Sequence, residues 1–335
     1  MTRGYLSIIV VLAILAALPF LVASNVVLNF VVFVLIITLT AQGWNLLGGV
    51  GGQNSFGHAA FFGTGAYVSA MLQVHYGVNA WVALAAAIAG GAVVGWIIGF
   101  LSFRAGLKGS YFALVTLAFA EVLRILANAM EFTGGAAGLL LKLDTGFWNL
   151  QFSSRAAFVW LALFFVALAL FISQWIANSR FGAHLVAVRE NEEAAKALGV
   201  DVLAVKLRAI TISGAITATA GCLYLQYFLY IDANIAYGVW ISIEALLAAM
   251  VGGRGLVLGP IIGAFSLHGL GEVTKLAAGR VPGIDLAVYG AVLILVVGFA
   301  PGGILGLINK LRFRGRPRPE PEKAATPAPK TEEAA

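Results

Sequence analysis

Long apolar stretches follow one another along most of the chain, separated by short polar segments. A helix needs about 20 apolar residues to cross the roughly 30 Å hydrocarbon core of a bilayer. Ten stretches are candidates, at residues 5–24, 26–47, 56–74, 80–103, 110–130, 156–177, 207–231, 239–251, 257–276 and 285–308. The eighth is too short to span alone, so we expect it to be one half of a broken helix. The pattern predicts an all-α fold, a polytopic integral membrane bundle of about ten spans.

Two glycine-rich segments interrupt this pattern. In the first, LLGGVGGQNSFGHAAFFGTGAY, the glycines are mixed with the polar residues Gln53, Asn54, Ser55 and His58, among others. At membrane depth, non-helical backbone is tolerated only where protein buries it or where it lines a wet cavity. We therefore expect a broken or re-entrant segment here and take Asn45–Tyr67 as a candidate wall of a translocation pathway. The second, MVGGRGLVLGPIIGAF (Met250–Phe265), has different glycine spacing, so it indicates an internal repeat only weakly.

Glycine also has a packing role within the spans. In GGAVVGWIIG, Gly91, Gly95 and Gly99 recur every four residues. This spacing places them on one smooth helix face, which predicts a close approach to a neighbouring helix in the lipid.

Composition excludes a soluble domain of this length. Hydrophobic residues make up 61% of the chain and charged residues 11%, against about a quarter charged in soluble proteins. We predict a transmembrane permease domain over residues 1–309, with a long loop at 179–206. Residues 310–335 hold eleven charges and five of the nine prolines, and they are expected to form a basic, disordered cytoplasmic tail. Its basic residues favour membrane lipids as partners, and no nucleic acid is expected.

The basic residues predict the orientation in a bacterial cytoplasmic (inner) membrane. With the N-terminus inside, sixteen lysines and arginines fall on the inner side and four on the outer side. The outer four are Lys142, Arg155, Lys275 and Arg280. The positive-inside rule then places both termini in the cytoplasm. Residues 179–206 form the largest cytoplasmic loop and Glu131–Arg155 the largest outer one.

One dense island of charge lies between two apolar spans, in SRFGAHLVAVRENEEAAKALGVDVLAVKLR (Ser179–Arg208). Its apolar residues recur at intervals of three and four, which predicts a helix with an apolar stripe: Phe181, Leu185, Val188, Ala195 and Leu198. Asn191 is expected to cap a second short helix, Gly199 to end it, and Asp201 to cap the next span. A solvated connecting loop is the alternative. Because the stripe has no evident partner in its own chain, the pattern favours a docking surface for a soluble subunit.

Ionisable residues inside the spans are further candidates. Glu121 and Arg124 lie three residues apart and can meet on one helix face, either as a structural pair or in the pathway, and the same two roles stay open for Glu244. His58 is either a hydrogen-bonded packing residue or a proton carrier. The candidate pathway residues are Asn45, Gln53, Ser55, His58, Tyr67, Glu121, Arg124 and Glu244.

The sequence contains little that would indicate an enzymatic reaction. The four histidines are scattered, and neither a metal-binding H-E-x-x-H motif nor a G-x-x-x-x-G-K-[ST] phosphate loop occurs. We expect no metal, no cofactor and no enzymatic activity, and any nucleotide must be bound by another chain.

Several collinear segments resemble a known family. ENEEAAKALG contains E-A-A-x-x-x-G and resembles the EAA loop of bacterial ABC importer permeases, which forms a coupling helix on the ATP-binding subunit. Together with GWNLLGGVGGQNSFGHAAFFGTGAY and KGSYFALVTLAFAEVLR, the island is similar to M-type (LivM-like) permeases of branched-chain amino acid importers, over roughly Ala41 to Pro301. Two features depart from the family pattern: the loop lacks the closing Leu-Pro, with Ile210 one place late, and TGGAAGL (Thr133–Leu139) carries alanines where polar residues are common.

The resemblance implies a function and an assembly. The chain would be the permease subunit of an ATP-driven ABC importer for branched-chain or related amino acids. Its partners would be a homologous second permease (LivH-like), two ABC ATPase subunits and a periplasmic substrate-binding protein. The implied ATPase-coupling residues are Arg180, Arg189, Glu190, Glu192, Glu193, Ala194, Ala195 and Gly199.

A stand-alone secondary transporter is the alternative function. It would use Glu121 or Glu244 for proton coupling and broken helices for the substrate site. In either case the sequence leaves the substrate open among branched-chain and other amino acids, urea-like amides and aromatic acids.

Overall fold

The computed structural model describes residues 2–22, 24–278 and 302–312, with isolated residues between 283 and 294. Its long helices are α1 (Thr2–Leu21), α2 (Asn25–Trp44), α3 (His58–Tyr76), α4 (Ala80–Arg104), α5 (Gly109–Ala129), α6 (Arg155–Ala177), α9 (Val202–Phe228), α11 (Val239–Gly253) and α12 (Gly259–Ala278). Most of the predicted tenth span, 285–308, and nearly all of the predicted tail, 310–335, lie outside the described residues.

Shorter elements connect these helices. They are the π-helix η1 (Asn45–Val50), the 3-10 turns η2 (Glu131–Thr133), η3 (Gly135–Ala137) and η4 (Phe147–Asn149), the helices α7 (Arg180–Glu190), α8 (Glu192–Ala197), α10 (Ala233–Ala236) and α14 (Gly303–Arg312), and the strands β1 (Leu139–Leu140) and β2 (Tyr230–Ile231). The two strands pair antiparallel. No other strand pair occurs in the described part of the chain.

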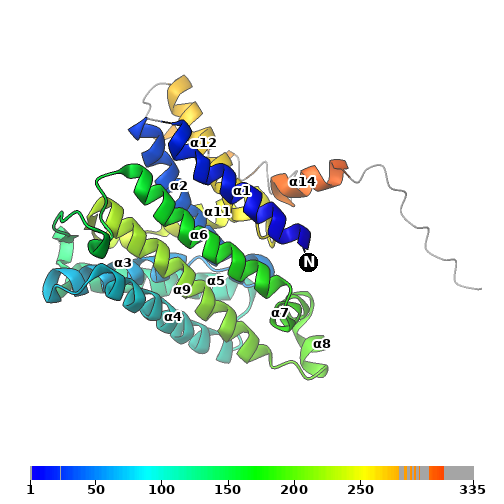
Figure 1. Cartoon of the computed structure of the whole chain (residues 1–335). Coiled ribbons are helices and arrows are strands. Elements are labelled where there is room, and N and C mark those ends of the chain that lie inside the picture. Colours follow the sequence, from blue (N-terminus) through cyan, green and yellow to red (C-terminus); the bar gives the residue numbers. More distant parts are fainter. Residues whose placement is uncertain are drawn as a thin grey trace, which may run out of the picture.

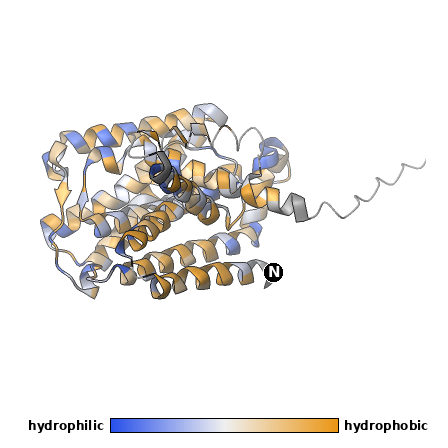
Figure 2. Ribbon diagram, turned by 90° about the horizontal axis from the view of Figure 1, so that it is seen from above, coloured by the Kyte–Doolittle hydropathy of each residue, from blue (hydrophilic) through white to orange (hydrophobic). Residues whose placement is uncertain are grey.

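Seven segments within the described residues are long and apolar enough to cross a membrane. They are Gly4–Leu21, Asn25–Val50, Ala80–Arg104, Gly109–Ala129, Arg155–Ala177, Val202–Phe228 and Ala233–Gly253. The fold is therefore the predicted polytopic helical bundle, while the count of ten spans stays a prediction. Apolar residues cover the outward faces of the long helices (Figure 2), and Leu114, Phe164 and Trp175 are among the large exposed ones. Such a surface suits lipid better than water.

The predicted broken helix at the eighth segment is present. Its helical part α11 has 15 residues, and Tyr237 and Gly238 separate it from the single turn of α10. With α10, the segment is 21 residues long, and about 20 apolar residues suffice to span.

Helix α9 lies at the centre of the bundle, in contact with α2, α3, α4 and α6 (Figure 1). Small residues allow the closest of these contacts. A Cβ added at Gly91 of α4 would overlap with the Ala218 side chain, and one at Gly95 would lie 2.8 Å from the Ile210 carbonyl oxygen. The predicted close packing of this glycine face is confirmed.

The bundle has two distinct ends. Helices α7 and α8 lie where α9 begins, and we call this the coupling end (Figure 1). Strands β1 and β2 lie where α9 finishes, and we call this the sheet end. The 27 residues of α9 separate the two by about 40 Å. Gly4 lies beside Gln174 and Gly303 beside Gly253, so the starts of α1 and α14 both lie toward the coupling end.

Replacement of Gly221 by alanine is expected to destabilise the bundle. An added Cβ there would overlap with the Phe62 carbonyl oxygen, which is backbone of α3 and cannot turn aside. Overpacking of this kind costs about 1–3 kcal/mol. Gly269→Ala is the matched control, because no atom outside its own stretch of helix lies within 4 Å of its added Cβ. Thermal unfolding in detergent should show a lower midpoint for Gly221→Ala only, and equal midpoints would contradict the assigned packing.

Candidate functional site

Each of the two short helices at the coupling end begins at a residue whose side chain caps it, and the sequence predicts the cap of the second. The Ser179 hydroxyl accepts from Gly182 N at 3.2 Å and begins α7. Asn191 Oδ1 accepts from Ala194 N at 3.0 Å and begins α8, whose first turn contains Glu192 and Glu193. Acidic side chains in that position favour the positive N-terminal end of a helix.

The end of α8 and the start of α9 also follow the prediction. Gly199 has a φ of +85°, the left-handed conformation that favours glycine after a helix. Two residues later, Asp201 Oδ1 accepts from Ala204 N at 3.0 Å and begins α9. The island of charge is thus a fixed pair of helices rather than an irregular connecting loop.

The apolar stripe of these helices has a partner in its own chain, which corrects the expectation that it lacks one. Leu185, Val188 and Ala195 are buried and belong to the main hydrophobic core of the bundle. Phe181 packs partly against the same core, and only Leu198 is exposed, at 85%. The stripe fixes α7 and α8 to the ends of the spanning helices. Any surface for a second protein therefore consists of the opposite, polar face together with Leu198.

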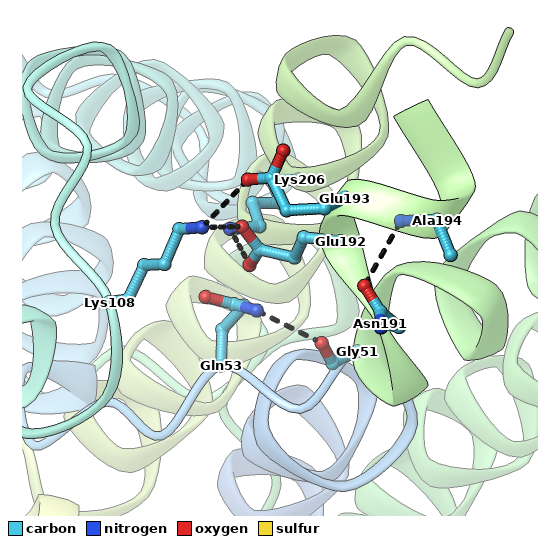
Figure 3. A network of polar contacts seen from close by, with 8 residues as sticks. All are labelled: Gly51, Gln53, Lys108, Asn191, Glu192, Glu193, Ala194 and Lys206. Carbon is cyan, nitrogen blue, oxygen red and sulfur yellow. Dashed lines mark hydrogen bonds and ion pairs between the residues drawn. The ribbon is translucent and has the colours of Figure 1, made fainter. Parts of the chain in front are cut away.

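An ion cluster reinforces this attachment (Figure 3). Glu192 lies between two lysines: its Oε2 is 2.9 Å from Lys108 Nζ, and its Oε1 bonds to Lys206 Nζ. Lys206 is buried in α9 beside the Phe103 ring, so it needs a counter-charge. The neighbouring Glu193 is exposed and contacts only Lys108 within this cluster, at 3.5 Å. The cluster joins α8 to α9 and to the α4–α5 connection.

The ionisation of the cluster follows from this geometry. Burial disfavours the Glu192 carboxylate, but hydrogen bonds from Lys206 and Lys108 outweigh that effect and hold its pKa below the ordinary value. The hydrogen bond to Glu192 likewise raises the pKa of Lys108. Glu192 and Lys108 are therefore both charged near neutral pH.

The predicted coupling residues fall into two groups. The exposed group consists of Arg180, Glu190, Glu193, Ala194 and Gly199. Ala195 and Glu192 instead face the bundle. Arg189 contacts both sides: its guanidinium bonds to the exposed Glu190 carboxylate at 2.7 Å and to the Gly49 carbonyl oxygen at 3.3 Å. Contact with a partner is geometrically open to the exposed group and to Leu198.

The first glycine-rich segment is a helix break, as predicted. After α2 the chain forms the π-helix η1 and then runs non-helically from Gly51 to Gly57 before α3 begins. Hydrogen bonds within the segment stabilise the break. Trp44 Nε1 donates to the Ser55 carbonyl oxygen at 2.8 Å, and Gln53 Nε2 donates to the Gly51 carbonyl oxygen at 3.3 Å. The Ser55 hydroxyl accepts from Gly57 N at 3.1 Å. Gln53 and Ser55 are buried.

The second glycine-rich segment is also a break, and it contacts the first. The chain is non-helical from Arg254 to Leu258, between α11 and α12. Asn45 bridges the two breaks: its Oδ1 accepts from Gly255 N at 2.8 Å, and its Nδ2 donates to the Leu256 carbonyl at 3.0 Å. A buried amide here supplies the bonds that the interrupted helices no longer make.

Two arginines complete this junction. Arg254 Nη2 donates to the Gly48 carbonyl oxygen at 2.7 Å and to Asn54 Oδ1 at 3.0 Å. Arg189, from α7, reaches the adjacent Gly49 carbonyl. The junction therefore joins the two breaks to each other and to the coupling end.

Deeper in the bundle, polar contacts fix the start of α3. His58 Nε2 lies 2.9 Å from the Ser213 hydroxyl, which donates to the Gly43 carbonyl at 2.7 Å. Next to it, Ala59 N donates to the Ser242 hydroxyl at 2.9 Å. These bonds tie α2, α3, α9 and α11 together, which supports the packing role for His58.

The remaining pathway candidates lie further along the helices. Tyr67 stacks on Tyr237 with ring centroids 5.6 Å apart. Glu121 and Arg124 form a two-bonded ion pair, with distances of 2.9 and 2.6 Å, and Arg124 also donates to Asn234 Oδ1 at 2.7 Å. These bonds lock α5 to the α10 turn, which supports the structural role for the pair. Glu244 is half-buried on α11. The candidates thus line several helices rather than one compact site.

Sequence reasoning missed three residues of the site: Lys108, Lys206 and Arg254. For Lys206 the sequence did contain a signal, because it lies within an apolar run. Lys206 is indeed buried, and a buried charge needs a partner. The partner, Glu192, lies 14 residues away, beyond the reach of helical spacing. For Arg254 the only signal in the sequence is its position between the glycines of the second break.

Apolar spanning helices, two helix breaks in contact and a braced helical loop define a polytopic membrane protein of the transporter class. The chain belongs to the family described as the permease component of the branched-chain amino acid transport system, which matches residues 26–297. This confirms the resemblance noted in the sequence.

Individual relatives support the same assignment. The high-affinity branched-chain amino acid permease protein LivM of Escherichia coli K12 is 29% identical over 324 residues, covering 90% of this chain and 74% of LivM. The LivH permease protein of the same organism is 29% identical over 285 residues, covering 80% of this chain and 90% of LivH. The nucleoside ABC transporter permease NupC of Lactococcus lactis is 29% identical over 150 residues, covering 42% and 46%. The chain is LivM-like. No solved structure matches it.

Replacement of Glu192 by glutamine is expected to loosen α8. The buried amino group of Lys206 would lose its carboxylate partner, at a cost of about 1–3 kcal/mol. That cost corresponds to roughly 5- to 150-fold faster amide hydrogen exchange across residues 191–199, provided that α8 opens locally. Glu193→Gln is the control, because its side chain is 79% exposed. Equal exchange rates in the two variants would rule out Glu192 as the brace.

Proposed function

We propose that this chain is the transmembrane permease subunit of an ATP-driven ABC importer for branched-chain or related amino acids. It would act in a bacterial cytoplasmic membrane. Its partners would be a homologous LivH-like permease, two ABC ATPase subunits and a periplasmic substrate-binding protein. Family membership supports the transport class, and the observation that carries the proposal is the EAA-like helix α8, braced inward by Glu192 and exposed on its other face.

In this proposal the coupling end faces the cytoplasm. The excess of lysine and arginine on that side of the sequence supports the orientation. The starts of α1 and α14 lie toward the same end, as expected if both termini are cytoplasmic. The sheet end would then face the periplasm and receive substrate from the binding protein.

The proposed mechanism is alternating access with α7 and α8 as a rigid lever. Closure of the ATPase dimer would move the exposed face of α8. The buried stripe and the Glu192 cluster would transmit that movement to α9 and to the α4–α5 connection. Through Arg189 and the Gly49 carbonyl, α7 would move the junction of the two breaks. Because backbone bonding is irregular there, this is where the bundle bends most easily.

The competing function is a secondary transporter with Glu121 or Glu244 in proton coupling. The bonds of Glu121 to Arg124 favour a structural role for that carboxylate. Reconstitution separates the two functions. Uptake by the chain alone in proteoliposomes, driven by a proton gradient, would support the secondary transporter and overturn the importer. ATP-dependent uptake that needs the ATPases would support the importer.

Replacement of Leu198 by aspartate is expected to weaken ATPase docking. Leu198 is the most exposed large apolar side chain of the loop, at 85%, and full burial of a leucine side chain contributes about 1.5–3 kcal/mol. Co-purification of the ATPase subunits and ATP-driven uptake should each fall by at least about tenfold. Leu140→Asp, at the sheet end and 71% exposed, is the control and should leave ATPase binding unchanged.

Replacement of Glu193 by arginine tests the charged part of the same surface. The side chain is exposed, so the protein should accumulate in the membrane at normal levels. We expect ATP hydrolysis to continue while uptake falls, because a reversed charge disturbs a rim contact without unfolding α8. Normal uptake in both this variant and Leu198→Asp would refute docking through α8.

A further inference from the structure

A polar cavity lies at the sheet end, far from the helix breaks and from the coupling surface. Its volume is about 670 Å³, large enough for an amino acid with its first waters. It is bordered by the beginnings of α2 and α6 and by the last turn of α9. Nothing in the proposed lever mechanism uses these residues.

Helix ends with opposite partial charges border this cavity. Helices α2 and α6 turn their N-termini toward it, through Asn25 and Arg155, and neither Ser24 nor Ser154 makes a capping bond with its side chain. Open N–H groups and the helix dipole favour an anion there. The C-terminal turn of α9 lies on the same cavity, and the negative end of the helix dipole there favours a cation.

An unpartnered amide gives independent evidence for a ligand. Gln226 lines the cavity, is only 2% exposed, and has neither a donor for its Oε1 nor an acceptor for its Nε2 among the described residues. Buried amides are almost always hydrogen-bonded. A ligand with both donors and acceptors would satisfy both atoms.

The other side chains that line the cavity also favour a ligand with both a negative and a positive group. Arg155 is the one charged residue among the described residues that line the cavity, and it interacts with the Tyr227 hydroxyl. That hydroxyl donates to Asn29 Oδ1. The aromatic rings of Phe152 and Phe158 supply an apolar surface between these groups. A simple cation would face Arg155 unfavourably, and a simple anion would face the carbonyl groups of α9.

We propose that this cavity binds the zwitterion of an amino acid with an apolar side chain. The carboxylate would lie between Arg155 and the N-terminus of α6. The ammonium group would lie at the C-terminal turn of α9, with Gln226 Oε1 as acceptor, and the side chain would contact Phe152 and Phe158. This proposal rests on the proposed function in its substrate class, and it makes the cavity the receiving site on the side of the binding protein.

Binding of radiolabelled L-leucine to the assembled complex, without binding protein and without ATP, tests the ligand chemistry. In nanodiscs of phosphatidylglycerol, unlabelled L-leucine should compete, whereas 4-methylpentanoate and 3-methylbutylamine should each bind at least about tenfold more weakly, since each lacks one charged end. Phosphatidylethanolamine also carries a zwitterionic headgroup. Loss of leucine binding in nanodiscs that contain it would assign the cavity to lipid and overturn the proposal.

Two variants test the location. Gln226→Leu should lower leucine affinity by about tenfold or more while raising the thermal midpoint of the free protein, since it removes an unpaired buried amide. A purely structural residue would not separate affinity from stability in this way. Arg155→Gln should lower affinity similarly. The matched controls, Gln174→Leu on α6 near the coupling end and Lys142→Gln at the sheet end, should bind as the unaltered protein does.

The outcomes separate this proposal from the proposed function. If the unaltered complex imports leucine with ATP and binding protein, but Gln226→Leu and Arg155→Gln neither weaken binding nor slow uptake, the cavity assignment is wrong and the importer stands. If the unaltered complex imports no amino acid, the proposed function fails. Absence of leucine binding in phosphatidylglycerol nanodiscs overturns the cavity proposal in either case.

Discussion

The hydrogen bonds between the two helix breaks are the constraint on which the bundle depends. A membrane offers no partner for a free backbone carbonyl, so each interruption of a spanning helix must be compensated within the protein. Asn45 compensates by bonding both to Gly255 and to Leu256, and Arg254 does so at Gly48. Each break thus supplies what the other lacks. A change in one break must be accompanied by a change in the other, and through Arg189 by a change in α7.

Helix α9 extends this dependence along the length of the bundle. Near its start Lys206 bonds to Glu192 of α8, and near its end Gln226 lines the polar cavity. The 20 residues between them rise by about 30 Å. Glycine and alanine contacts with α3 and α4 keep the helix closely packed, and close packing resists bending. In the proposed mechanism, movement at the coupling end would therefore reach the opposite end as displacement of a stiff rod rather than as local deformation.

Much of the fold could be predicted from the sequence, because its signals are local. Apolar length identified the seven helical segments long enough to span. Glycine with polar residues identified the first break, and Asn191 and Gly199 identified the limits of α8. The sequence did not predict contacts between residues that lie far apart in the chain. The periodicity of the stripe through Leu185 was correct, but period alone cannot say whether an apolar face meets a partner protein or its own bundle. The pairing of Glu192 with Lys108 joins residues far apart in sequence and needs the fold itself.

The burial of the stripe changes what the coupling loop can do. A loop held only by a partner would transmit force poorly, because its attachment to the bundle would give way first. Glu192 and Glu193 avoid this difficulty by their position in a helix, where successive side chains point about 100° apart. The first is directed inward to Lys206 and Lys108, and the second is exposed. In the proposed importer, adjacent carboxylates would thus divide two tasks, attachment to the moving bundle and contact with the ATPase that moves it.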